Sequence, residues 1–159
     1  MKAIVAYFSA EGATERYAKA LAEELGAALF AIVPEAPYTA ADLKWTNPLA
    51  RCNREKLGKK DVPVRGRVED WAAYDTVLLG FPIWYYAAPN VIQTFCKDYD
   101  WTGKGLFLFA TSGGSNIGKT AEKLSPFLKG EPRILGAKVY QSVEDLKRDA
   151  AGLVSGKTE

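Results

Sequence analysis

Three stretches of the sequence hold the residue types that bind phosphates and flat rings. They are SAEGAT at 9–14, GFPIWYYAAPN at 80–90 and TSGGSNIGKT at 111–120, and they are named here loop A, loop B and loop C. Loops A and C combine hydroxyls with glycines, which leave backbone amides open to close approach. Loop B holds consecutive aromatic residues. Each loop is therefore a candidate ligand-binding segment.

Loop C contains a complete match to a nucleotide-binding pattern. Residues 113–120, GGSNIGKT, fit the phosphate-loop pattern G-x-x-x-x-G-K-[ST], and they lie between an apolar run and an amphipathic stretch. A triphosphatase also needs a strand that ends in aspartate to hold Mg²⁺, and no expected strand ends in that way. The first expected strand ends in FSAEG rather than in an aspartate. A phospho-receiver is therefore not expected either. A triphosphate site therefore ranks below other ligands.

Loop A combines Ser9, Gly12 and Thr14 at the expected start of a helix. Backbone amides, hydroxyls and the positive end of a helix together can hold a phosphate. The alternative is that the hydroxyl only caps the helix, which is the commoner role of threonine at such a place. Loop A alone leaves both roles open.

Loop B places Trp84, Tyr85 and Tyr86 directly after an apolar run and before Pro89, which suits the first turn of a helix. Core packing explains one or two aromatic residues there. Three in a row within a surface loop favour a planar ligand, because aromatic faces stack on conjugated rings.

The chain has no histidine, and its two cysteines, Cys52 and Cys96, lie far apart. Catalysis by Ser-His-Asp or Cys-His groups is thereby excluded, as are most transition-metal sites. Any catalysis is expected to belong to a cofactor, and no catalytic side chain is predicted. No apolar run approaches the roughly 20 residues that span a bilayer. A reduced, cytoplasmic protein without membrane insertion is the simplest interpretation.

Apolar runs and helical periods alternate along the chain, which predicts an α/β fold with a doubly wound parallel sheet of five strands. The runs are apolar throughout, as expected for strands covered on both faces. The strands are expected at 2–8, 28–34, 75–82, 105–111 and 137–141. Helices are expected from Thr14 to Gly26, from Pro89, around Ala121 and after Ser142. The length fits a single domain over residues 1–159.

Residues 35–74 are too long for one connecting helix and are expected to form one or two short helices with loops. Within them, the segment 44–67 holds eight basic residues against two acidic ones. A solvated surface is the first interpretation of this charge. The alternative is a docking surface for an acidic partner or an anionic cosubstrate. Nucleic acid is not expected, because the net charge is only +2 and no binding motif accompanies the segment.

The order and spacing of YFSAEGAT, YDTVLLGFPIWYYAAPN and FATSGGSNIGKT resemble the three flavin-binding loops of the flavodoxins. The resemblance is closest to the subgroup whose motifs read roughly TSGGSG and G-x-P-I-W-W, and it covers nearly the whole chain. It implies a flavodoxin-like domain with strand order 2-1-3-4-5 and flavin mononucleotide (FMN) as the cofactor.

The resemblance also implies a role for each loop. The FMN phosphate would lie against loop A, at Ser9, Glu11, Gly12, Ala13 and Thr14. The isoalloxazine ring would be flanked in loop B by Pro82, Ile83, Trp84 and Tyr85, with one of the two aromatic residues stacked on it. The other edge of the ring would meet loop C at Thr111, Ser112, Gly113, Gly114 and Ser115.

Two features depart from the family pattern. Loop A reads E-G-A-T where the family usually has T-G-N-T, so Glu11 replaces a hydroxyl and Ala13 an amide side chain. A carboxylate beside a phosphate is repulsive unless it points to solvent, which predicts weaker FMN binding. Flavodoxins are typically acidic, whereas this chain is slightly basic. It is therefore not expected to dock the same basic partners.

The function implied by the resemblance is electron transfer between redox partner proteins through bound FMN. An alternative is an NAD(P)H-dependent FMN or quinone reductase, although no G-x-G-x-x-G fingerprint follows the first strand. A flavin-free interaction module with the same fold is the alternative from another class.

Overall fold

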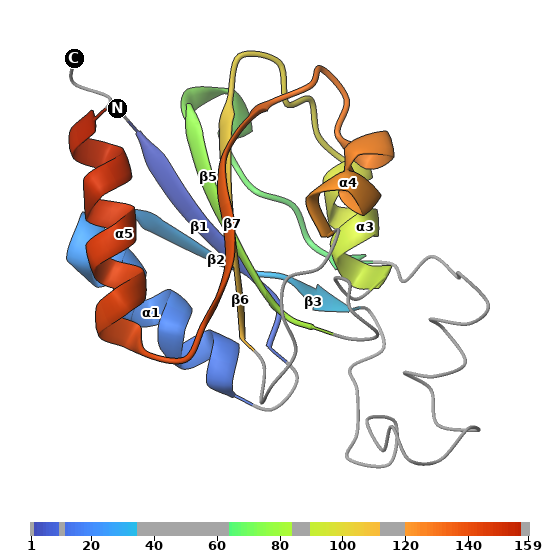
Figure 1. The fold of residues 1–159 in the computed structure, drawn as a ribbon. Helices are drawn as coiled ribbons and strands as arrows, with labels where there is room; N and C mark the ends of the chain where they lie inside the picture. Colours follow the sequence, from blue (N-terminus) through green and yellow to red (C-terminus); the bar gives the residue numbers. More distant parts are fainter. Residues whose placement is uncertain (1, 10–11, 35–63, 84–89, 112–119, 157–159) are drawn as a thin grey trace, which may run out of the picture.

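A computed structural model of the chain describes residues 2–9, 12–34, 64–83, 90–111 and 120–156. Its centre is a parallel sheet of five strands in the order β2-β1-β5-β6-β7 (Figure 1). The strands are β1 (Ala3–Tyr7), β2 (Ala28–Ala31), β5 (Thr76–Pro82), β6 (Gly105–Thr111) and β7 (Arg133–Tyr140). The predicted α/β fold with a five-stranded parallel sheet is confirmed.

The two remaining strands form a separate antiparallel pair, β3 (Val33–Pro34) with β4 (Val64–Arg65). The sequence predicted one strand over 28–34, but β1 ends at Tyr7 opposite Ala31 and offers β2 no further partner. The chain after Ile32 therefore pairs elsewhere. Since β3 and β4 come between β2 and β5, the strand numbers differ in detail from the predicted 2-1-3-4-5, which holds only if the sheet's own strands are counted.

Helices cover both faces of the sheet, as the doubly wound prediction requires (Figure 1). On one face lie α1 (Ala13–Leu25) and α5 (Val143–Gly156). On the other lie α3 (Asn90–Lys97) and α4 (Thr120–Leu124), which continues as the 3₁₀ helix η3 (Ser125–Phe127). A second 3₁₀ helix, η2 (Trp71–Ala73), precedes β5. None of the helices within the described ranges is long and apolar enough to cross a bilayer.

The core consists of two apolar clusters, one on each face of the sheet. Alternate strand residues belong to different clusters: Val5 and Leu78 pack with α1 and α5, whereas Ile4 and Val77 pack on the opposite face. All residues of β6 are buried. Burial on both faces explains why these strands read as continuous apolar runs rather than alternating ones.

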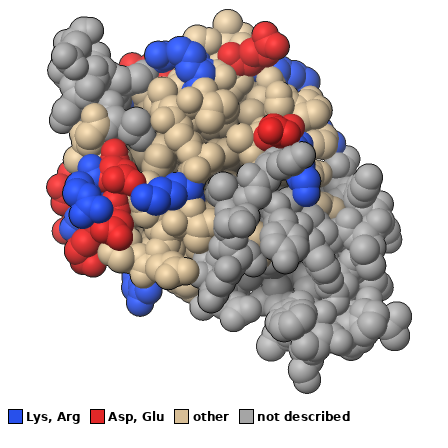
Figure 2. Space-filling view, viewed as in Figure 1, with Lys and Arg blue, Asp and Glu red and all other residues tan. Residues whose placement is uncertain are grey.

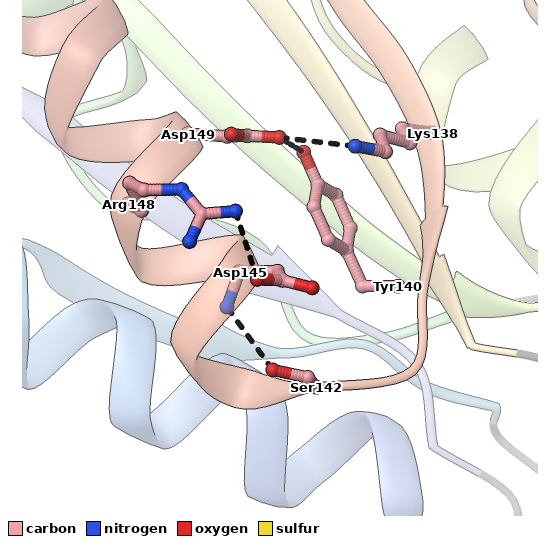
Figure 3. Close-up of polar contacts among 6 residues, drawn as sticks. All are labelled: Lys138, Tyr140, Ser142, Asp145, Arg148 and Asp149. Atoms are coloured by element: carbon pink, nitrogen blue, oxygen red, sulfur yellow. Dashed lines mark hydrogen bonds and ion pairs between the residues drawn. The ribbon is translucent and has the colours of Figure 1, made fainter.

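Local signals begin and end the helices on the α1 face. The helix α1 ends at Gly26, whose φ of +61° suits glycine. At the start of α5, the Asp145 amide donates to Ser142 Oγ over 3.2 Å (Figure 3). The sequence placed the last strand at 137–141, but β7 begins at Arg133. Its first two residues, Arg133 and Ile134, are exposed, and their pairing with Gly105 and Leu106 of β6 makes them part of the strand.

The end of the sheet at which the strands begin, here called the amino edge, holds a cluster of aromatic rings. Trp71 lies with its ring centroid 4.3 Å from that of Tyr99 and 4.8 Å from that of Trp101. Trp101 is fully buried, and its indole Nε1 donates to the Cys96 carbonyl over 2.9 Å.

The same cluster contains a buried lysine. Lys104, which precedes β6, is only 6% exposed, and its ammonium donates to the carbonyls of Trp71, over 3.0 Å, and Tyr74. Burial lowers the pKa of this ammonium below its ordinary value. The polar groups of the cluster are thus bonded to backbone atoms of the protein itself.

Candidate functional site

The strands β1, β5 and β6, after or within which loops A, B and C begin, all finish at the opposite end of the sheet (Figure 1). This end is called the carboxyl edge below. Because the strands are parallel, the segments that follow β1, β5 and β6 begin side by side, and ligands of such sheets bind at this edge. Of the predicted site residues, the structure describes Ser9, Gly12, Ala13, Thr14, Pro82, Ile83 and Thr111. The other seven lie outside the described residues: Glu11, Trp84, Tyr85, Ser112, Gly113, Gly114 and Ser115.

The three loops meet at Thr111, the last residue of β6. Its hydroxyl lies 2.7 Å from that of Thr14, the second residue of α1, and both residues are buried. Its carbonyl accepts a hydrogen bond from the Ile83 amide over 3.2 Å. One residue therefore connects loop A through its side chain and loop B through its backbone, while itself opening loop C. We call these three residues the threonine junction.

The position of Thr111 follows from the sheet. In the pairing of β5 with β6, Thr111 lies opposite Pro82, which has no amide hydrogen, and the next amide, that of Ile83, reaches its carbonyl. On the other side Thr111 pairs with Tyr140 of β7. The backbone of the junction is thus held by neighbours on both sides.

Loop A turns into α1 through glycine. Gly12 has a φ of +98°, which L residues with side chains rarely adopt, and among the described residues no atom beyond its chain neighbours lies within 4 Å of the place a Cβ would take. Its amide donates to Ser9 Oγ over 3.0 Å. Among the described residues, no side chain caps the first turn of α1. The amides of Ala13 and Thr14 therefore lie at the positive end of a helix that no described side chain caps.

The alternative role predicted for Thr14, a helix cap, is wrong. Gly12 holds the cap position, and Thr14 lies inside the helix with its hydroxyl directed across to β6. The sequence could not show this contact, because the two threonines are 97 positions apart.

A carboxylate beside loop A was missed by the sequence analysis. Glu15, in the first turn of α1, accepts a hydrogen bond from the Tyr7 hydroxyl over 3.2 Å and lies 3.5 Å from the Lys19 ammonium. Burial, and then the charge of Glu15, raise the pKa of Tyr7. The spacing of Glu15 and Lys19 by one helical turn was the available signal. Both contacts hold the Glu15 carboxylate on the α1 side of the sheet.

A second tyrosine and carboxylate pair ties β7 to α5 (Figure 3). The Tyr140 hydroxyl donates to Asp149 Oδ2 over 2.7 Å, and the Lys138 ammonium lies 3.5 Å from the same oxygen. Burial and the bond to Asp149 raise the pKa of Tyr140, and that bond lowers the pKa of Asp149. These contacts attach the end of β7, the strand next to Thr111, to α5.

Charges on the described surface are mixed in sign. On the face drawn in Figure 2, acidic and basic side chains lie next to one another, and ion pairs such as Lys147 with Glu24 join α5 to α1. Most of the basic segment 44–67 lies outside the described residues. Arg67 at its end donates to the Asp98 carbonyl over 2.9 Å and lies over the Tyr99 ring. Partner docking at this segment stays a prediction.

Cys96 is buried in α3, and that burial raises the pKa of its thiol. A raised pKa disfavours the reactive thiolate. Cys52 lies outside the described residues.

Comparison with known proteins gives a family match over most of the chain. Residues 2–145 match the family model described as flavodoxin. No curated protein sequence matches the chain.

Solved structures from three bacteria are similar over nearly their whole length. A protein described as a flavoprotein from Bacteroides eggerthii is 36% identical, with 97% of this chain and 98% of that one covered and a TM-score of 0.86. A second, from Bacteroides uniformis, is 38% identical, with coverages of 94% and 97% and a TM-score of 0.80. A flavoprotein from Lactobacillus acidophilus, solved in complex with FMN, is 22% identical, with coverages of 92% and 98% and a TM-score of 0.70. By its family match and its sequence identity to these proteins, this chain belongs to the flavodoxin family.

Proposed function

We propose that this protein binds FMN at the carboxyl edge and transfers electrons between redox partner proteins. The observation that carries the proposal is the threonine junction, because the hydrogen bonds of Thr111 join a residue of loop A and a residue of loop B to the start of loop C. Membership of the flavodoxin family and the FMN complex of the similar Lactobacillus acidophilus protein support it.

The residues of loop A fit a phosphate. A phosphate needs several donors and little competing negative charge, and the first turn of α1 offers the Ala13 and Thr14 amides. The Ser9 oxygen accepts from the Gly12 amide, so its own hydroxyl hydrogen remains for a ligand. No described atom beyond its chain neighbours would meet a Cβ at Gly12, so the described residues leave a ligand room to approach the backbone. The Glu15 carboxylate is held by Tyr7 and Lys19.

The isoalloxazine ring would lie between loops B and C. In loop B, Pro82 and Ile83 are half-buried at the end of β5, and Ile83 packs against the core. These residues would fix the start of the loop that carries Trp84 and Tyr85. When bound, FMN supplies the redox chemistry, while the side chains bind it, orient it and tune its potential by stacking and hydrogen bonds.

The direct test is a titration of the purified protein with FMN, followed by flavin fluorescence and visible absorption. We expect quenched fluorescence and shifted flavin bands at one equivalent, because aromatic stacking quenches flavin emission. A protein that leaves the fluorescence and spectrum of FMN unchanged would refute the proposal. Such a result would favour a flavin-free interaction module.

A pair of substitutions tests the aromatic residues of loop B. Replacing Trp84 and Tyr85 together by alanine is expected to weaken FMN binding by about tenfold to a hundredfold and to raise the redox potential. The reason is that base–aromatic stacking contributes roughly 1–3 kcal/mol per ring and that stacking on an electron-rich aromatic disfavours the reduced flavin. Tyr86→Ala is the matched control and should change both less. If the double variant keeps its affinity and potential, these rings do not stack on the flavin.

The electron-carrier role is tested with the FMN-loaded protein alone. Mixed with NADPH or NADH alone, it is expected to remain oxidised over minutes, whereas an added flavin reductase domain should pass electrons from NADPH to its FMN. Rapid oxidation of NAD(P)H in the absence of any partner would identify the protein as a reductase instead.

A further inference from the structure

We infer that Thr111 is a positioning residue for phosphate recognition: its hydroxyl orients the hydroxyl of Thr14 toward the phosphate of the flavin. The inference rests on the proposed function and deepens it. It assigns a loop C residue, predicted only to line the ring, to the selectivity of loop A for a phosphorylated ligand.

The geometry is that of a short hydrogen bond between two buried hydroxyls. The Oγ1 atoms of Thr14 and Thr111 are 2.7 Å apart, and the residues are 2% and 8% exposed. Either atom can be the donor. The backbone of Thr111 is fixed by its pairing with β5 and β7, so its hydroxyl can serve as a fixed reference for Thr14.

Counting hydrogens leaves two arrangements of this pair. Each hydroxyl has one hydrogen, and the bond between them uses one of the two. If Thr14 donates to Thr111, its hydrogen is consumed and cannot reach a ligand at the start of α1. If Thr111 donates to Thr14, the Thr14 hydrogen is left for a ligand beside the Ala13 and Thr14 amides.

A phosphate selects the second arrangement. A phosphate monoester carries between one and two negative charges at neutral pH and accepts hydrogen bonds at its oxygens. Thr14 then donates to the phosphate and accepts from Thr111, which gives a chain of hydrogen bonds running from Thr111 through Thr14 to the ligand. No proton is transferred, because only the two hydroxyl rotors turn. Bonds in such a chain strengthen one another.

Riboflavin provides the discriminating ligand, since it has the same ring as FMN but no phosphate. Thr111→Val removes the hydroxyl at nearly constant volume. We expect it to weaken FMN binding about fivefold and riboflavin binding less than about twofold, because only FMN uses the oriented Thr14 hydroxyl. Thr111→Ser keeps a hydroxyl and is expected to retain the FMN preference of the wild type.

A double-mutant cycle separates orientation from simple contact. Thr14→Val is expected to lower the ratio of FMN to riboflavin affinity by about tenfold. With Thr14→Val present, adding Thr111→Val should leave that ratio unchanged, because Thr111 acts through Thr14. Equal losses for both flavins in Thr111→Val, or independent effects of the two substitutions, would overturn the inference. Circular dichroism and thermal melting of each variant show that it is folded.

A second measurement needs no flavin. Inorganic phosphate at millimolar concentration is expected to raise the Tm of the wild type and of Thr111→Ser more than that of Thr111→Val or Thr14→Val. If phosphate discriminates in this way but neither flavin binds, the proposed function is wrong while the role of Thr111 stands. If phosphate raises all four Tm values equally and the flavin ratio does not change, the role of Thr111 is wrong.

Discussion

The two ends of the sheet differ in the groups that accept hydrogen bonds from their polar side chains. At the amino edge, the indole of Trp101 and the ammonium of Lys104 donate to backbone carbonyls within a cluster of packed rings. At the carboxyl edge, the Thr14 and Thr111 hydroxyls bond to each other, and no described side chain caps the first turn of α1. Among the described residues, one end is closed by the protein's own groups, whereas the other is the end at which we propose that donors meet the flavin phosphate.

This difference implies that the amino edge serves mainly the stability of the fold, whereas the carboxyl edge serves mainly ligand binding. Groups that bond to fixed backbone atoms contribute to the free energy of unfolding and can change only if the structure opens. The Thr14 and Thr111 hydroxyls, either of which can donate to the other, and the first amides of α1 contribute less to the free energy of unfolding. They can, however, change hydrogen-bond partners when a ligand arrives. We therefore expect substitutions at the amino edge to lower stability without affecting FMN affinity, and substitutions at the carboxyl edge to affect both or affinity alone.

The largest effect is expected from Trp101→Ala. Among the described residues, it removes the largest fully buried side chain, and such truncations cost about 3–5 kcal/mol in the free energy of unfolding. The FMN affinity of the folded fraction should stay within about twofold of wild type. Urea unfolding followed by circular dichroism, and FMN titration in buffer, measure the two quantities. Trp101→Phe is the milder variant if the alanine protein does not fold. A selective loss of FMN affinity in either variant would contradict the separation of the two edges.

The next effect is expected from Lys104→Met, which keeps the length of the side chain but removes its ammonium. The Tyr74 carbonyl then loses the Lys104 donor, and we expect the free energy of unfolding to fall by about 1–3 kcal/mol. The Lys104→Arg variant retains donors and should lose less. If Lys104→Met is as stable as the wild type, relief of charge burial outweighs the lost bonds, and this lysine does not secure the amino edge.

Two glycines at opposite ends of α1 give a matched pair of variants. Gly12 and Gly26 both have positive φ, +98° and +61°, and at both sites a Cβ would meet no atom within 4 Å. Alanine at either position is therefore expected to cost about 1 kcal/mol through backbone strain alone. Only Gly12→Ala should also weaken FMN binding, by severalfold, because Gly12 lies in loop A. Equal FMN affinity of the two variants would show that the backbone of Gly12 does not approach the ligand.

The smallest effect is expected from two tyrosines that donate to carboxylates, Tyr7 to Glu15 and Tyr140 to Asp149. Phenylalanine at either position should lower stability by about 1 kcal/mol at pH 7. Tyr7→Phe should in addition weaken FMN binding slightly, because Glu15 in the first turn of α1 loses one of the contacts that hold it. Tyr140→Phe should leave FMN affinity unchanged. The reverse order of the two affinities would contradict the placement of the phosphate at loop A.

The pH dependence of the Tyr140 pair has a defined sign. The pKa of Tyr140 is raised above its ordinary value of 10.0 in the folded protein, so its contribution is present below pH 10.0 and is lost as the pH rises further. The pKa of Asp149 is lowered, chiefly by the Tyr140 bond, so its contribution is lost as the pH falls through that lowered value. Tyr140→Phe should flatten the alkaline loss of stability and raise the Asp149 pKa, which an NMR titration of the carboxyl measures.

Much of the fold was readable from local pattern. The strand predicted at 105–111 has the same bounds in the structure, and the helix expected from Thr14 to Gly26 begins only one residue earlier, at Ala13. These elements are strongly periodic or wholly apolar, so the local pattern of apolar residues is enough to predict their type and their bounds. The start of β7 at Arg133 could not be read, because pairing with β6 rather than composition makes its exposed first residues a strand.

The sequence could propose the three candidate loops, whose ligand stays a prediction, but not the contacts between them. Glycine, hydroxyl and aromatic residue types identified loops A, B and C, and family membership is confirmed. That Thr14 contacts Thr111 depends on the register of β6 beside β5 and β1, which no local pattern reports. The pairing of Val33 with Arg65 in β3 and β4 is long-range in the same sense.

The complete burial of β6 has a consequence for the kinetics of association. Thr111 ends a strand in which all residues are buried, so its conformational entropy is lost during folding and not again when a ligand arrives. A ligand that meets the junction encounters an acceptor and donor pair already at its final spacing, and only hydroxyl rotations on the picosecond-to-nanosecond scale remain. The junction itself should therefore not limit the rate of flavin capture, and any slow phase in binding would have to arise in another part of the chain.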